Sequence, residues 1–130
     1  MSAAVASPPQ SADATRLNEL YGANKSLSLS VSAALAMQLP PQVGAEQIDA
    51  HVWVCERAAA EHQGEELEAH FEACRDAAVA LADLAREAED GLVPTQRRLE
   101  AVRRTHRHLR RLVWEVFDCE YVPCGHERNH

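Results

Sequence analysis

The fold is decided by residues 45–91, AEQIDAHVWVCERAAAEHQGEELEAHFEACRDAAVALADLAREAEDG. In its first part, about Ala45 to His62, core-type side chains recur at steps of four and three residues: Ile48, Val52, Cys55, Ala59 and His62. This spacing is typical of one face of an amphipathic helix. Gly64 follows at the position where a helix C-terminal cap is expected. The pattern therefore predicts a helix that ends in a tight turn.

The second part of this stretch predicts a longer helix, from about Glu65 to Glu89. Its first turn is acidic, which suits the positive end of a helix dipole. The inward stripe is Leu67, Phe71, Cys74, Ala78, Leu81, Ala85 and Ala88. The stripe does not continue in phase across Gly64, and Gly91 ends the second helix. We therefore expect two antiparallel helices joined by a short turn rather than one long rod.

A further helix is predicted after Gly91. Pro94 suits its first turn. Its apolar stripe consists of Leu99, Val102, His106, Leu109, Val113 and Val116. A short turn at Gly91 makes this helix antiparallel to the one before it.

The region before residue 45 is less regular. We predict a short helical turn from about Thr15 to Tyr21, interrupted at Gly22 and Asn24. Serines alternate with Leu or Val over residues 26–32, which is a strand pattern, but no partner strand is evident elsewhere in the sequence. We therefore predict a helix from about Ser28 to Gln38, ended by two prolines.

The chain of 130 residues suits one domain. We expect an all-α fold: an antiparallel up-and-down bundle of about four helices over residues 13–118. Residues 1–12 are rich in Ala, Ser and Pro and read as a disordered tail. Residues 119–130 form a Cys/His-rich C-terminal tail. Aromatic residues are only 5% of the chain, so the core is expected to consist of small and aliphatic side chains.

No secretory signal and no apolar run of membrane-spanning length are evident. We therefore expect a soluble, cytoplasmic protein that makes no membrane contact and whose cysteines are reduced. The alternative is export with two disulfides, because the four cysteines are an even number.

Charge is unevenly distributed in this acidic protein, which has a net charge of −7. Residues 46–90 hold thirteen acidic residues against three arginines, and residues 94–117 hold seven arginines against two glutamates. We expect the acidic and basic parts to pair within one fold and to cancel in part.

The arginine-rich helix is also a candidate binding surface, because guanidinium groups bind carboxylates and phosphates. We expect no aromatic side chain for base stacking on its arginine face, and an acidic body repels nucleic acid. An acidic protein partner is therefore favoured, with nucleic-acid contact as a minor alternative. Trp53 and Trp114 lie off the inward stripes, where aromatic residues anchor interfaces or pack on the N-terminal helix. The candidate partner-binding residues are Arg97, Arg103, Arg104, Arg107, Arg111, Trp53 and Trp114.

The final twelve residues, CEYVPCGHERNH, hold Cys119, Cys124, His126 and His130. Thiolates and imidazoles are the ligands that zinc selects. Because one short segment carries all four, it can wrap around a single ion. The alternative interpretations are a tail without metal and a disulfide between the two cysteines.

A second metal hypothesis comes from helix register. In an antiparallel hairpin Cys55 and Cys74 share a layer, and His51 and His106 are expected at a similar level. Four such ligands would suit zinc or copper(I). The alternative is that the cysteines are ordinary core residues and that the histidines are hydrogen-bonded within the fold.

Two function classes follow. The favoured hypothesis is a small non-enzymatic adaptor or regulatory module that binds another protein and carries a structural zinc at its C-terminal cluster. The alternative is a metal-handling protein, a sensor, carrier or store of zinc or copper(I). The sequence has no nucleophile elbow and no phosphate-binding loop, so we expect no enzyme. A homodimer is compatible with the Ala-rich helices.

Overall fold

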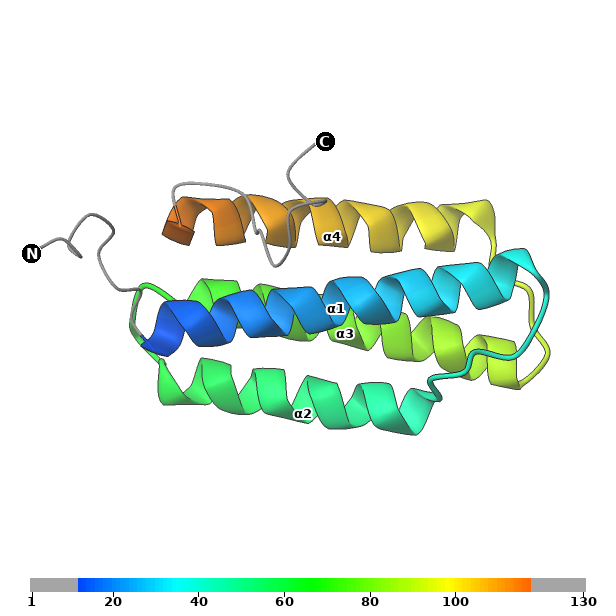
Figure 1. The fold of residues 1–130 in the computed structure, drawn as a ribbon, viewed down its shortest axis with the longest axis horizontal. Coiled ribbons are helices and arrows are strands. Elements are labelled where there is room, and N and C mark those ends of the chain that lie inside the picture. The colour runs from blue at the N-terminus through cyan, green and yellow to red at the C-terminus, as the bar shows by residue number, and fades with distance from the viewer. Residues whose placement is uncertain (1–11, 118–130) are drawn as a thin grey trace, which may run out of the picture.

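The computed structural model describes residues 12–117, which form a bundle of helices without a strand (Figure 1). The helices are α1 (Ala12–Ala36), α2 (Ala45–Glu61), α3 (Glu68–Glu89) and α4 (Gln96–Phe117). Successive helices run in opposite directions, as the colour gradient in Figure 1 shows. The predicted all-α, up-and-down bundle of about four helices is therefore confirmed.

Helix α3 is the central element of the bundle because it packs on each of the other three helices. Helix α1 also packs on α4, whereas α2 packs mainly on α3. As Figure 1 shows, α2 and α4 lie on opposite sides of the α1–α3 pair. Each of these two outer helices consequently has one face directed away from the core.

The core consists of two clusters arranged along the bundle. The first surrounds Phe71, which is fully buried, and includes Leu17, Cys55 and Leu109 from the three other helices. The second surrounds Leu81, near the opposite end. Many core positions of α2 and α3 are occupied by alanine rather than by leucine or valine. Small side chains let these helices approach closely, which agrees with the low aromatic content.

Helix α1 corrects the prediction for the N-terminal region. It runs without interruption through Gly22 and Asn24, where the sequence suggested a break. The buried Asn24 Nδ2 donates hydrogen bonds to the carbonyl oxygens of Leu20 (3.1 Å) and Cys74 (3.4 Å), whereas its Oδ1 has no hydrogen-bond partner, so the donor of this local helix breaker is satisfied within the packed bundle. Packing outweighs local propensity here.

The Ser/Leu alternation of residues 26–32 is likewise helical in the structure. Leu29 is 64% exposed, whereas Val31 is 1% exposed. A strand would have placed both side chains on one face. The buried side chains of α1 recur at helical spacing: Ala14, Leu17, Leu20, Tyr21, Asn24 and Val31.

Two predicted helix starts shift by a few residues. Helix α3 begins at Glu68 and not at Glu65, because a turn occupies residues 62–67. Helix α4 begins at Gln96 and not at Pro94. The Thr95 hydroxyl accepts a hydrogen bond from the Arg98 backbone N–H at 3.2 Å, which makes Thr95 the N-terminal cap.

Candidate functional site

The outward face of α4 carries three arginines and a tryptophan at helical spacing. Arg104, Arg107, Arg111 and Trp114 are separated by three, four and three residues, which places them along one side of the helix. All four are exposed, and Trp114 is 48% exposed. We refer to these four residues as the α4 face.

A shallow hollow of about 240 Å³ lies on this part of α4 and is lined by Arg107, Arg110, Arg111 and Trp114. The expectation that the arginine face has no aromatic side chain is therefore wrong. Trp114 does not belong to the buried stripe of α4. It lies next to the arginines on the exposed side of the helix. Arginine side chains beside an indole ring suit a ligand that carries both carboxylates and apolar groups.

Few of the α4 arginines pair with the acidic helices. Arg98 forms an ion pair with Glu87 of α3 at 2.6 Å. Arg103 pairs with Glu100 of its own helix at 3.6 Å. The remaining candidates, Arg97 and the three arginines of the α4 face, form no ion pair with residues 12–117. The expected pairing of acidic and basic residues therefore does not include direct ion pairs at the α4 face within residues 12–117, although Arg104 lines a hollow together with Glu72 and Asp76 of α3.

The second tryptophan belongs to another surface. Trp53 lies on α2 and is 57% exposed, with the Arg57 guanidinium 5.2 Å from its ring centroid. Because α2 and α4 flank the bundle on opposite sides (Figure 1), Trp53 and Trp114 do not form one patch. Neither tryptophan is buried under the N-terminal helix.

The predicted interior residues are partly brought together. Cys55 and Cys74 are fully buried in the same core cluster, and the Cys55 sulfur lies 3.7 Å from His51 Nε2. Burial raises the pKa of the Cys55 thiol to about 12. Burial, together with the neighbouring Cys55, raises the pKa of Cys74 as well. Both thiols are therefore protonated at neutral pH, which makes them poor nucleophiles.

His106 lies on the side of α4 near Lys25 of α1. Burial, and secondarily the Lys25 charge, lowers its pKa, and burial also lowers the pKa of His51. Within residues 12–117, no three His, Cys, Asp or Glu side chains are arranged to hold a metal ion. We therefore do not propose a metal at His51, Cys55, Cys74 and His106. The C-terminal candidates Cys119, Cys124, His126 and His130 lie outside the described residues.

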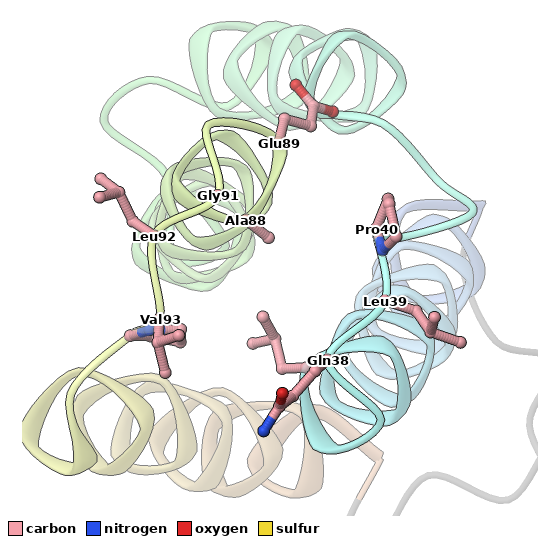
Figure 2. Close-up of a pocket in the computed structure, with 10 residues that line it drawn as sticks. Gln38, Leu39, Pro40, Ala88, Glu89, Gly91, Leu92 and Val93 are labelled. Atoms are coloured by element: carbon pink, nitrogen blue, oxygen red, sulfur yellow. The ribbon is translucent and has the colours of Figure 1, made fainter.

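A cavity that the sequence did not indicate opens at the end of the bundle where α1 and α3 terminate (Figure 2). It measures about 410 Å³ and is lined mostly by apolar groups, including Leu35 and Ala88. Nearby Leu92 and Val93 are 58% and 83% exposed. The Glu89 carboxylate at its edge accepts a hydrogen bond from the Ala45 N–H at 2.8 Å. That carboxylate is thus already engaged in holding the start of α2.

A second cavity, of about 480 Å³, lies at the opposite end, between the start of α3 and the end of α4. It is lined by Glu66, Leu67, His70, Glu115 and Val116. The His70 side chain is only 12% exposed, yet neither ring nitrogen has a hydrogen-bond partner. Its Nε2 lies 3.8 Å from a Glu115 carboxylate oxygen, which is an ion-pair distance but too long for a hydrogen bond. Sequence periodicity missed this cluster because it depends on the register between two helices.

No protein-family model, curated protein or solved structure matches this chain. No helix within residues 12–117 combines the length and the hydrophobicity needed to span a membrane.

Proposed function

We propose that this protein is a small non-enzymatic adaptor or regulatory module that binds an acidic segment of another protein on the α4 face. One observation carries the proposal: Arg107 and Arg111 are exposed beside Trp114, Arg104 extends the same side of α4, and none of the three arginines forms an ion pair with residues 12–117. Positive charge that the fold does not neutralise attracts a complementary surface. The half-exposed indole supplies apolar area of the kind that anchors interfaces.

Protein carboxylates are favoured over nucleic acid as the occupant of this face. The chain as a whole carries a net charge of −7, so a long polyanion is repelled by the remainder of the molecule. A short acidic segment can contact α4 alone, because α4 lies at one side of the bundle (Figure 1). Trp114 is the one aromatic residue that lines the hollow on α4, whereas single-stranded nucleic acid is bound by successive stacking platforms.

Fluorescence anisotropy tests the proposal with two probes, a labelled oligoglutamate peptide and a labelled DNA duplex. We expect the peptide to bind and the duplex to bind more weakly. The triple variant Arg104→Gln/Arg107→Gln/Arg111→Gln should lose peptide binding. Arg75→Gln is the matched control, because Arg75 belongs to α3 and already pairs with Asp76 at 2.9 Å. Equal loss in the control, or preference for DNA, would overturn the proposal.

The structural zinc at Cys119, Cys124, His126 and His130 is part of the proposal and is supported by the donor chemistry of the sequence. A metal-handling role is the second candidate. It has less support, because no three His, Cys, Asp or Glu side chains within residues 12–117 are grouped to hold a metal ion. Elemental analysis of reduced protein separates the two roles: a structural zinc stabilises the fold, whereas a carrier site exchanges its metal.

A further inference from the structure

The geometry of the hollow between α3 and α4 points to a symmetric dimer, in which two copies of this chain pack together through the same hollow. We call this surface the interhelix hollow; its charged and polar lining is Glu72 and Asp76 of α3 with Arg104 and His108 of α4. The inference goes beyond the proposed acidic partner. Although Arg104 extends the α4 face, the hollow beside Trp114 shares no lining residue with the interhelix hollow.

The interhelix hollow leaves room for a helix of another molecule. It measures about 420 Å³, and all of its lining residues within the described chain come from α3 and α4. Between the charged side chains it is lined by alanines, of which Ala69 and Ala101 are exposed and Ala73 is buried. Because these side chains are short, a second backbone can approach closely. Val79, one helical turn after Asp76, is 41% exposed and adds apolar area to the same side of α3.

The two sides of the interhelix hollow carry groups of opposite character. Glu72 and Asp76 lie on the α3 side, and Arg104 and His108 lie on the α4 side. Neither Glu72 nor Arg104 forms an ion pair with residues 12–117, and Asp76 pairs only with the neighbouring Arg75 of its own helix. The acidic and basic rows lie at the same level along the bundle, because they line one hollow. They are therefore available to a surface that carries the opposite charges in the opposite order.

A second copy of this chain presents such a surface. A twofold axis that runs parallel to the helices places α3 of each copy on α4 of the other and leaves every level along the bundle unchanged. Glu72 and Asp76 of one copy then face His108 and Arg104 of the second copy, and the same contacts are repeated on the other side of the axis. A twofold axis across the helices would instead place α3 on α3 and oppose carboxylates with carboxylates. The charge pattern thus selects both the partner and its orientation.

The area of this surface is sufficient for a specific contact. Helices α3 and α4 have 22 residues each, so each is about 33 Å long. Two adjacent helices are about 20 Å wide together, which gives about 660 Å² per copy and about 1,300 Å² for the dimer. Specific interfaces begin near this size. Because the facing charges are at the surface, the association is expected to be reversible and to weaken as salt is added.

Sedimentation equilibrium of the full chain tests the dimer, with reductant and chelator present so that neither a disulfide nor a metal ion links two copies. We expect a reversible monomer–dimer equilibrium for the wild-type chain. The variants Glu72→Arg/Asp76→Arg and Arg104→Glu/His108→Glu should each raise the dimer dissociation constant by more than about 100-fold, because each one places like charges opposite one another. A wild-type chain that stays monomeric at high concentration would overturn the inference.

The matched control is Glu46→Arg/Glu56→Arg. It changes the net charge by the same amount as Glu72→Arg/Asp76→Arg, but at two exposed positions of α2, which does not line the interhelix hollow. Its dissociation constant should stay within about twofold of the wild-type value, because surface changes outside an interface have little effect. A loss equal to that of the α3 variant would show that net charge, and not the hollow, governs association.

Mixing the two reversal variants gives the sharpest result. Each fails to pair with itself, but the arginines at positions 72 and 76 of one match the glutamates at positions 104 and 108 of the other, so an equimolar mixture should form a heterodimer. Circular dichroism reports whether each variant is folded. The milder Glu72→Gln/Arg104→Gln removes charge without reversing it and should raise the dissociation constant about tenfold, which keeps the test valid if a reversal variant does not fold. Two folded variants that remain monomeric when mixed, or an unchanged constant in the milder variant, would contradict the dimer; these measurements contain no peptide, so they are independent of the proposed function.

Discussion

Gln38 and Gly91 adopt the same left-handed backbone conformation at the same end of the bundle, where both line the cavity of Figure 2. Their φ angles are 56° and 80°. After Gln38, the Leu39 N–H donates to the Ala34 carbonyl at 2.8 Å; after Gly91, the Leu92 N–H donates to the Glu87 carbonyl at 2.8 Å. Both helices thus end in the hydrogen-bond pattern of a Schellman cap, but only one has the residue that this cap prefers.

This relationship predicts opposite effects of two substitutions. Gln38→Gly should stabilise the protein by about 0.5–1 kcal/mol, because it relieves left-handed strain at the cost of a more flexible unfolded chain. Gly91→Ala should destabilise it by about 1 kcal/mol. No atom lies within 4 Å of a Cβ placed at Gly91, so the cost would come from the backbone alone. Urea unfolding measures both, and a loss of stability in Gln38→Gly would contradict the interpretation.

His106 should make the free energy of unfolding decrease as the pH falls into the acidic range. Burial, together with Lys25, lowers its pKa below the ordinary value of 6.5. The unfolded chain therefore binds more protons than the folded chain as the pH falls below about 6.5, and the free energy of unfolding decreases. His106→Gln should reduce this slope, as seen in urea midpoints across the acidic range. His108→Gln, an exposed change on the same helix, should leave it unaltered; an unaltered slope in His106→Gln would refute the prediction.

The buried thiols should be unreactive until the bundle opens. The pKa of Cys55 is raised from 9.0 to about 12 by burial, which lowers its thiolate fraction at pH 8 about 1,000-fold. In a Cys119→Ser/Cys124→Ser background, alkylation of Cys55 and Cys74 should therefore be slow in buffer and rapid in denaturant. Mass spectrometry of the alkylated protein measures this. Rapid labelling of folded protein would show that the α2–α3 interface opens readily.

The contrast between α1 and the other helices shows which parts of the fold could be predicted from the sequence. The stripes of α2, α3 and α4 were predictable because periodicity and the turns at Gly64 and Gly91 agree with one another. In α1 the local signals at Gly22 and Asn24 opposed the helix. Only the packed structure reveals that the Asn24 amide reaches the Cys74 carbonyl.

The surfaces were harder to predict than the core. The side of α4 that carries Arg104, Arg107, Arg111 and Trp114 follows from their helical spacing, but the sequence does not show that these arginines lack ion-pair partners within residues 12–117. The pairing of His70 with Glu115 depends on the axial register of α3 against α4, which no single-helix pattern contains. Sites within one helix are thus visible in the sequence, and sites between helices are not.

The two tryptophans provide a matched test of which outer helix binds a partner. Trp53 and Trp114 are 57% and 48% exposed and belong to α2 and α4, which flank the α1–α3 pair on opposite sides (Figure 1), and each lies near arginine. If the α4 face is the binding surface, Trp114→Ala should weaken oligoglutamate binding by about tenfold, or about 1.4 kcal/mol. Trp53→Ala should change the Kd less than about twofold, because surface changes outside an interface have little effect. Isothermal titration calorimetry measures both dissociation constants. A larger loss of affinity in Trp53→Ala than in Trp114→Ala would show that the binding surface is on α2 and not on α4.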